Sequence, residues 1–267
     1  MCIIIAKTKT QKAPKIETLK TCFENNPDGA GFMYTDNNRV IIDKGYMTEK
    51  SLIKRYKYLK HKYNNFKNKS LVIHFRISTS GEITSEFTHP FIITDNIKDM
   101  KKEHTSAKIG VAHNGILTDY TPKNKNVNDT MLFIKRFLYN KFKNKKLFTD
   151  STRKQIEKTG SRFAILTKND NLHLYGDFIK DGVFYSNSTY KKDYYATFYN
   201  TYKYNYYDGL MIVSDYDIMI YEGYNIEARY FKTRKKTQLY YDWYNMRLYE
   251  MDGADVVSYT DYIDIEF

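Results

Sequence analysis

The chain opens with an apolar run, Cys2 to Ala6, that constrains its fold more than any other segment. Three consecutive isoleucines follow the cysteine, so both faces of an extended segment here are apolar. Such a strand must be buried on both sides, unlike a strand with one solvated face. The run also raises a chemical question, because its first residue is a thiol directly behind the initiator methionine.

Two interpretations of Cys2 are open at this point. A free cysteine usually behaves as a small, buried hydrophobic side chain. Alternatively, Met1 is removed, and Cys2 then carries both a thiol and a free α-amine. A thiol beside an amine is a nucleophile with its own base. The remaining motifs of the sequence distinguish a structural thiol from an N-terminal nucleophile.

Apolar patterning along the chain predicts a mixture of helices and strands. Helical spacing appears over residues 15–25 and 48–66, and the second of these has a lysine-rich face that is most simply solvent-facing. A further helix is expected over 126–142, with Asn128 or Asp129 suited to the N-cap. Short strands are expected at residues 29–34, 39–46, 70–78, 108–117, 162–167, 171–176 and 182–188. No regular strand–helix alternation appears, so the predicted fold class is α+β.

The composition changes near residue 190. Of the 27 tyrosines, 19 lie from Tyr185 onward. We therefore predict a first domain over residues 1–190 and a tyrosine-rich C-terminal extension over 191–267, packed on the core. Within the extension, residues 210–224 and 228–244 alternate enough to be strands.

Charge and cysteine content limit the class of protein. The formal charge of +12 is compatible with nucleic-acid binding, and equally with lysines spread over a solvated surface. Cys2 and Cys22 form no disulfide framework, which suits a reducing compartment. No stretch is apolar enough for a membrane span, so we expect a soluble, cytoplasmic protein with no membrane partner, in the host cytoplasm if the source is viral.

Five stretches carry polar or small residues where an ordinary core would not. Each has a common structural explanation when taken alone: an arginine after a strand is usually at the surface, Asn-Gly usually forms a turn, and an aspartate before a helix usually caps it. The stretches are residues 28–32 (DGAGF), 74–81 (HFRISTSG), 89–90 (HP), 112–115 (AHNG) and 128–130 (NDT).

In this order behind an N-terminal cysteine, the five stretches resemble the class II glutamine amidotransferases of the N-terminal nucleophile (Ntn) hydrolase superfamily. The resemblance covers about the first 190 residues and includes the spacing of Arg76, Thr79, Gly81 and His89-Pro90. NNPDGAGF is most similar to the stand-alone or phage-type members. The resemblance implies a four-layer αββα sandwich and hydrolysis of the glutamine side-chain amide, with ammonia passed to an unknown acceptor.

Two departures from the family pattern concern the acceptor. Members that act on sugars and nucleotides usually have an aromatic residue after the arginine, where this chain has Ile77. The residues after 190 are also too few for a synthase domain. A separate synthase or acceptor protein is therefore a possible partner, and cleavage of other γ-glutamyl amides by a stand-alone hydrolase is an alternative function.

The chemistry of amide hydrolysis assigns roles to the motif residues. The α-amine of Cys2 has a pKa of roughly 8 and can take the thiol proton. The resemblance implies that the Asn114 side chain and the Gly115 backbone N–H stabilise the oxyanion. No cofactor is needed.

Free glutamine is zwitterionic, so its pocket needs one cation and one anion. Arg76 can bind the α-carboxylate with its planar fork, and Asp129 can hold the α-ammonium group. By family analogy, Thr79 and His89 add hydrogen bonds to the substrate. For His89, ordering of the loop before Pro90 is an equal alternative.

The other polar residues are expected to be structural. Asp28, Gly29 and Gly31 would let their strand pack beside the strand of Cys2, and Cys22 would be an inert core thiol. His74 and His113 could suggest a metal pair, but both belong to the family pattern as packing residues, and no carboxylate cluster completes a ligand set. A third functional possibility is a catalytically silent nucleic-acid-binding module that uses its tyrosines as stacking platforms.

Overall fold

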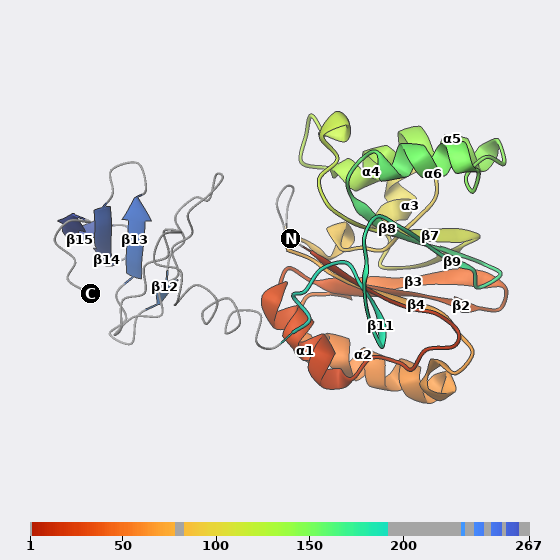
Figure 1. Cartoon of the computed structure of the whole chain (residues 1–267), viewed down its shortest axis with the longest axis horizontal. Coiled ribbons are helices and arrows are strands. Elements are labelled where there is room, and N and C mark those ends of the chain that lie inside the picture. The colour runs from red at the N-terminus through yellow and green to blue at the C-terminus, as the bar shows by residue number, and fades with distance from the viewer. Residues whose placement is uncertain are drawn as a thin grey trace. The chain divides into compact units, whose positions relative to one another are not determined.

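The computed structural model describes residues 2–77 and 83–191 in full, together with the backbone of four strands beyond them (Figure 1). The chain divides into two compact units, Met1–Lys192 and Asp193–Phe267. Helices and antiparallel sheets build the first unit. Among the described residues, no helix has the length and apolar character to cross a membrane.

Two antiparallel sheets form the centre of the first unit. The larger has the strand order β10-β11-β1-β4-β2-β3-β6, and the smaller has the order β5-β7-β8-β9. The strands of the larger sheet are β1 (Ile3–Lys7), β2 (Ala30–Asp36), β3 (Arg39–Tyr46), β4 (Leu71–Phe75), β6 (His104–Ala107), β10 (Ile179–Asp181) and β11 (Val183–Tyr185). The strands of the smaller sheet are β5 (Phe91–Ile92), β7 (Ile109–Asn114), β8 (Arg162–Thr167) and β9 (Leu172–Tyr175).

Helices flank the two sheets. Figure 1 shows α1 and α2 along the larger sheet, and α4, α5 and α6 beyond the smaller one. The helices are α1 (Ile16–Asn25), α2 (Glu49–Lys62), α3 (Ile97–Lys101), α4 (Asp129–Phe133), α5 (Tyr139–Lys143) and α6 (Asp150–Glu157), with a π-helical segment η4 (Ile134–Leu138) between α4 and α5. Three short 3₁₀ turns are η1 (Asn64–Phe66), η2 (Ser85–Phe87) and η3 (Thr118–Tyr120).

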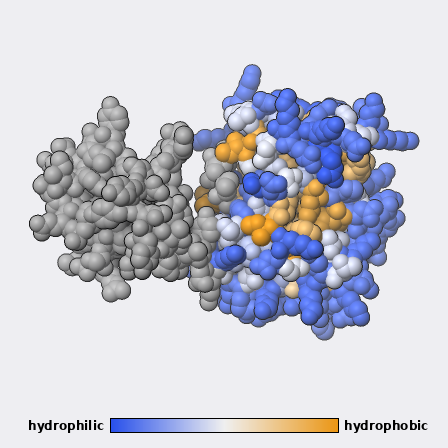
Figure 2. All heavy atoms as spheres, viewed as in Figure 1, coloured by the Kyte–Doolittle hydropathy of each residue, from blue (hydrophilic) through white to orange (hydrophobic). Residues whose placement is uncertain are grey.

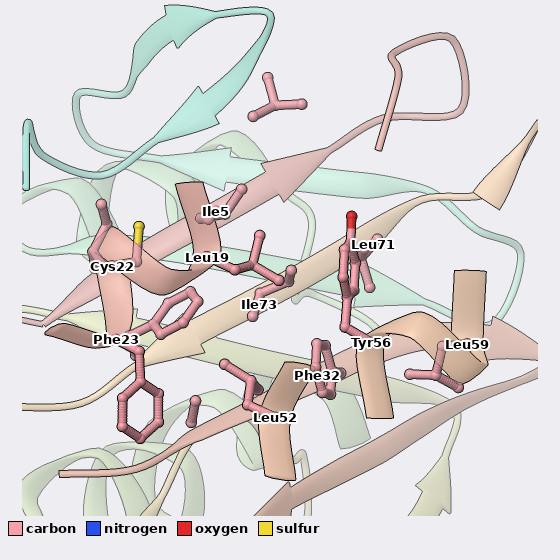
Figure 3. Close-up of a cluster of buried hydrophobic side chains, with 14 of the residues drawn as sticks. Ile5, Leu19, Cys22, Phe23, Phe32, Leu52, Tyr56, Leu59, Leu71 and Ile73 are labelled. Atoms are coloured by element: carbon pink, nitrogen blue, oxygen red, sulfur yellow. The ribbon is translucent and has the colours of Figure 1, made fainter. Parts of the chain in front are cut away.

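The strand that follows Cys2 separates two hydrophobic clusters. Ile3 and Ile5 pack with residues of α1 and α2 such as Leu19 (Figure 3), whereas Ile4 and Ala6 face the smaller sheet. All four side chains are at most 1% exposed. The prediction of a strand buried on both faces is therefore confirmed, and its cause is the alternation of side chains between the two sides.

Cys22 lies in the cluster beneath α1, as predicted for a core thiol. Its side chain is fully buried among apolar neighbours such as Leu19 and Phe23 (Figure 3). Burial raises the pKa of the Cys22 thiol far above its usual range, which keeps this sulfur protonated and unreactive.

The expected placement of the glycine-rich strand is wrong in one respect. β4 lies between β1 and β2, so the strand of Gly31 is not the direct neighbour of the strand of Cys2. Gly31 is needed for a different close approach: a Cβ there would lie 2.4 Å from the carbonyl oxygen of His89 and 2.4 Å from the Cβ of Lys44. The small residue therefore lets the His89-Pro90 segment approach β2.

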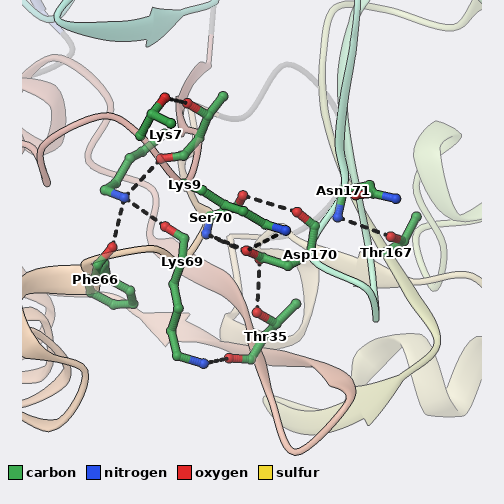
Figure 4. A network of polar contacts seen from close by, with 11 residues as sticks. Lys7, Lys9, Thr35, Phe66, Lys69, Ser70, Thr167, Asp170 and Asn171 are labelled. Atoms are coloured by element: carbon green, nitrogen blue, oxygen red, sulfur yellow. Dashed lines mark hydrogen bonds and ion pairs between the residues drawn. The ribbon is translucent and has the colours of Figure 1, made fainter.

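A polar network joins the two sheets at the end of β1 that is opposite Cys2 (Figure 4). Asp170, in the turn between β8 and β9, accepts a hydrogen bond from Thr35 of β2 at 2.9 Å and two from the Ser70 backbone N–H at 3.2 and 3.1 Å. Lys7 is almost fully buried and donates to the carbonyl oxygens of Thr8, Phe66 and Lys69. This end is thereby fixed by buried, satisfied polar groups.

The second unit contains a four-stranded antiparallel sheet with the order β12-β13-β14-β15. Its strands are β12 (Phe231–Lys232), β13 (Gln238–Asp242), β14 (Arg247–Asp252) and β15 (Asp255–Asp261). Two of them fall inside the strand expected over 228–244. The strand expected over 210–224 lies outside the described residues.

Candidate active site

Cys2 and Arg76 lie at the same end of the larger sheet. Ile3, the first residue of β1, pairs with Phe75, the last residue of β4, so the residues beyond them leave the sheet side by side. The Ile77 N–H donates to Cys2 Sγ at 3.4 Å, and the thiol contacts the Ile77 carbonyl oxygen at the same distance. Strand pairing alone therefore places the predicted nucleophile beside the predicted carboxylate-binding arginine.

The electrostatics of this pair are set by burial and by mutual attraction. Burial raises the pKa of the Cys2 thiol, while the Ile77 N–H and the Arg76 charge act in the opposite direction. Burial likewise lowers the pKa of Arg76, which is 4% exposed, and the neighbouring Cys2 and Asp28 oppose that shift. The Arg76 charge favours the thiolate, but burial is the larger effect, and the pKa of the Cys2 thiol is raised on balance.

The NPDG turn is bound to the backbone of Arg76. The Arg76 N–H donates to the Gly29 carbonyl oxygen at 2.8 Å, and the Asp28 N–H donates to the Arg76 carbonyl oxygen at 2.9 Å. These bonds extend the pairing of β2 and β4 past Phe75. The structural role expected for Asp28 and Gly29 agrees with this geometry. Thr79 and Gly81 lie outside the described residues.

Asn114, the last residue of β7, is connected to β1 through Ser186. The Asn114 side chain is 2% exposed, and its Nδ2 donates to Ser186 Oγ at 2.8 Å. The same oxygen accepts the Ile4 N–H at 2.8 Å, and Asn187 Nδ2 donates to the Cys2 carbonyl oxygen at 2.7 Å. Sequence reasoning missed Ser186 and Asn187; the only available signal was a polar Ser-Asn-Ser run at the end of an apolar strand.

Gly115 occupies a position that excludes any side chain. Its φ is +150°, and a Cβ built there would lie 2.2 Å from Ser161 Oγ. Glycine therefore lets the backbone after Asn114 approach Ser161 closely.

Asp129 joins the start of α4 to the segment after the Asn114-Gly115 turn. Its Oδ2 accepts the Leu117 N–H at 3.0 Å, and its Oδ1 accepts the Thr130 N–H at 2.6 Å and the Thr130 hydroxyl at 3.2 Å. The N-cap is Asn128, whose side chain accepts the Met131 N–H at 2.8 Å. Because Asn128 caps the helix, the Asp129 carboxylate bonds to the loop instead.

Three histidines pack together between these elements. The His74 and His89 ring centroids are 4.4 Å apart, and those of His89 and His113 are 6.3 Å apart. His74 Nε2 donates to the His113 carbonyl oxygen at 3.0 Å, which links the larger sheet to the smaller. His113 Nδ1 lies 2.8 Å from the Thr130 hydroxyl oxygen. Because that hydroxyl donates its hydrogen bond to Asp129, Nδ1 is the donor in the contact with Thr130.

The remaining ring nitrogens of the three histidines, including both of His89, have no hydrogen-bond partner among the described residues. Burial lowers the pKa of His74 to about 3 and that of His113 to about 4, and it holds the pKa of His89 well below 6.5. All three rings are therefore neutral at pH 7. Within the described part of the chain, no group of three His, Cys, Asp or Glu side chains is arranged to hold a metal ion.

A separate surface feature lies between α1 and α2. A pocket of about 340 Å³ is lined by Ile16, Lys57, Lys60, His61, Asn64 and Asn65. No acidic residue is among these lining groups; Asp43, Asp36 and Glu49 pair with Arg55, Lys62 and Lys20. Figure 2 shows hydrophilic residues around the edge of the described part and a group of hydrophobic residues nearer its centre. The expected lysine surface of α2 thus includes a concave, cationic site.

No protein-family model matches the chain, and no curated protein matches its sequence. Among solved structures, the glutamine phosphoribosylpyrophosphate amidotransferase from B. subtilis, complexed with ADP and GMP, is similar with 16% sequence identity and a TM-score of 0.39. The match covers 69% of this chain and 41% of the solved chain, so less than half of that enzyme's length is represented. A functional assignment therefore depends on the geometry of the site.

Proposed function

We propose that the first unit is an Ntn hydrolase that cleaves the side-chain amide of glutamine through a γ-glutamyl thioester on Cys2. The observation that carries this proposal is that the Cys2 thiol contacts Ile77, the residue directly after Arg76. Asn114 is linked to the strand of Cys2, because its side chain and the Ile4 N–H both bond to Ser186 Oγ. A partly buried cysteine with a purely structural role has no need of a neighbouring guanidinium and a buried amide. The order of helices, larger sheet, smaller sheet and helices supports the four-layer αββα sandwich.

The reaction begins once Met1 has been removed. The α-amine of Cys2 takes the thiol proton, directly or through one water molecule, and the sulfur attacks the side-chain carbonyl carbon of glutamine. The carbonyl oxygen becomes an oxyanion, which the Asn114 amide and the Gly115 N–H stabilise. Collapse of this intermediate breaks the C–N bond, and the amine returns the proton to the leaving ammonia. Water then hydrolyses the thioester to glutamate and restores the thiol.

Substrate recognition uses one cation and one anion. The Arg76 guanidinium binds the α-carboxylate, and its burial makes the charge effective because little water competes. Asp129 binds the α-ammonium group. Its two oxygens already accept three hydrogen bonds, but a carboxylate has about four lone-pair sites, so one acceptor position remains.

The substrate is tested with the purified full-length chain. Intact mass shows whether Met1 is absent, and release of glutamate and ammonia is measured for glutamine and for a panel of other γ-glutamyl amides. We expect steady turnover of glutamine by the wild-type protein and none by Cys2→Ala. Faster cleavage of another γ-glutamyl amide would instead support the stand-alone hydrolase, and dependence on an added acceptor protein would support an amidotransferase with a separate synthase.

A second activity, the binding of nucleic acid, is favoured by one observation. The pocket that Lys57 and Lys60 line concentrates positive charge in a concave surface next to α2. Cationic grooves of this kind bind phosphate backbones without sequence preference. This surface consists of residues other than the catalytic set, so both activities can coexist.

A further inference from the structure

Two residues directly after β11 connect the nucleophile to the oxyanion site. Ser186 contacts both Ile4 and Asn114, and Asn187 contacts Cys2 itself. We propose that Ser186 and Asn187, here named the Ser186–Asn187 clamp, are positioning residues that hold the Cys2 thiol at a fixed distance from the Asn114 amide. The inference rests on the proposed function, because only a shared substrate requires these two groups to keep one geometry.

Ser186 uses its hydroxyl where a β-ladder would use a backbone carbonyl. Its N–H donates to the Ile4 carbonyl oxygen at 3.0 Å, which continues the pairing of β11 with β1 past Tyr185. The Ile4 N–H then bonds to Ser186 Oγ at 2.8 Å rather than to the Ser186 carbonyl. The chain can therefore turn away from the sheet after Ser186 while Ile4 remains satisfied.

The same hydroxyl orients the Asn114 amide. A serine oxygen has two acceptor positions, and Ile4 and Asn114 occupy both. The Asn114 amide carries two N–H groups, so one is held by Ser186 and the other is left for the oxyanion. Ser186 is 2% exposed, and water therefore cannot easily replace its hydroxyl.

Asn187 bonds directly to the backbone of the nucleophilic residue, Cys2. Its Oδ1 is anchored by the Thr189 N–H at 3.1 Å and by the Thr189 hydroxyl at 2.8 Å, and its Nδ2 donates to the Cys2 carbonyl oxygen at 2.7 Å. Cys2 precedes Ile3, the first residue of β1 in the pairing with β4. A terminal residue outside the ladder would fray unless it is tied down, and Asn187 supplies that bond.

The clamp should affect the rate of acylation more than the binding of glutamine. Neither residue is expected to contact the α-carboxylate or the α-ammonium group, which Arg76 and Asp129 bind. A misplacement of reacting groups by about 1 Å can lower the rate on the order of 100-fold. We therefore expect loss of the clamp to reduce kcat by at least about tenfold and to change KM by less than threefold.

The sharpest variant is Asn187→Asp, which retains an acceptor for Thr189 and loses the donor to Cys2. Thr189→Val is the matched control, because it removes the hydroxyl bond to Asn187 Oδ1 while the backbone N–H bond of residue 189 and the Asn187 contact with Cys2 stay in place. Ser186→Ala tests the hydroxyl, and Ser186→Thr should restore most of the activity because it returns an oxygen at the same position. A kcat within twofold of wild type for both Asn187→Asp and Ser186→Ala would overturn the clamp.

Amide hydrogen exchange over residues 3–6 gives a readout that needs no substrate. The clamp predicts at least tenfold faster exchange in Ser186→Ala and Asn187→Asp than in wild type or Thr189→Val, with the rest of the first unit unchanged. If the wild-type protein cleaves no γ-glutamyl amide, the proposed function fails, and this exchange difference alone then decides the holding role: its presence supports the clamp, and its absence overturns it.

Discussion

The Nε2 atom of His74 donates to the carbonyl oxygen of His113 at 3.0 Å and thereby joins β4 to β7 beneath the candidate active site. Arg76 lies two residues after His74, and Asn114 directly follows His113. This bond between the buried ring of His74 and the backbone of His113 therefore fixes how the ends of the two sheets meet. It also makes the arrangement sensitive to acid, because burial opposes protonation of both rings and outweighs the nearby Asp129 carboxylate, which favours it at His113.

The first prediction concerns stability against pH. The unfolded chain protonates His74, His89 and His113 near pH 6.5, whereas the folded chain keeps them neutral down to about pH 4 for His113 and about pH 3 for His74. The unfolded state then binds more protons, so the free energy of unfolding falls as the pH drops below 6.5. Each histidine contributes a slope of up to about 1.4 kcal/mol per pH unit. Urea unfolding between pH 7 and pH 4.5 measures this slope.

His89→Phe is the matched variant for that experiment. Both ring nitrogens of His89 lack a hydrogen-bond partner among the described residues, so a phenyl ring removes the titrating group without breaking a described bond. We expect a shallower decline in unfolding free energy below pH 6.5 than in the wild type. Identical pH profiles for the two proteins would contradict a neutral, buried His89.

A second prediction concerns Gly115. A Cβ in Gly115→Ala would lie 2.2 Å from Ser161 Oγ and 2.7 Å from Ser161 Cβ, so the backbone must shift. Loss of one oxyanion donor raises the barrier by about 3 kcal/mol, and we expect kcat to fall on the order of 100-fold. Adding Ser161→Gly removes both close atoms and should recover part of the rate. No recovery in the double variant would show that the clash is not the cause.

A third prediction separates binding from reactivity at Arg76. Arg76→Lys retains a positive charge but loses the planar fork that pairs with a carboxylate. We expect the KM for glutamine to rise at least about tenfold. Alkylation of Cys2 by iodoacetamide, which has no α-carboxylate, should change less than threefold. If both values change equally, Arg76 acts on the thiol and not on the substrate.

The fourth prediction tests the cationic pocket beside α2. Lys57→Glu with Lys60→Glu should weaken binding of a single-stranded oligonucleotide, measured by fluorescence anisotropy at low and moderate salt, at least about tenfold. Lys154→Glu in α6 with Lys158→Glu at its C-terminal cap changes the net charge equally and is the control. Equal losses in the two double variants would indicate binding by overall charge and would remove the pocket from the account. Glutamine hydrolysis should be the same in both.

Local patterns predicted the elements that position the site. The apolar run of β1, the helical spacing of α1 and α2, and the cap at the start of α4 depend on near neighbours in the chain, so they can be recognised from the sequence. The helix expected over 48–66 ends earlier, at Lys62, because Asn64, Asn65 and Phe66 adopt positive φ values. The helix expected over 126–142 is divided by the π-helical segment η4, which no sequence pattern predicted.

Contacts between distant segments could not be predicted in the same way. The placement of β4 between β1 and β2 follows from sheet topology, which the glycines of residues 28–32 do not encode. Ser186 and Asn187 lie more than 180 residues from Ile4 and Cys2, the residues that they bind. Their serine and asparagine side chains are ordinary turn residues in sequence, and only the fold gives them a partner.

The central claim is that Cys2, as the first residue of the mature chain, becomes covalently acylated. The most direct measurement is intact-mass and peptide mapping of the protein after reaction with a diazoketone analogue of glutamine. We predict one adduct per chain, on Cys2 of a protein that lacks Met1, with protection by excess glutamine. A chain that keeps Met1, or an adduct that forms on Cys22 or not at all, would contradict the account.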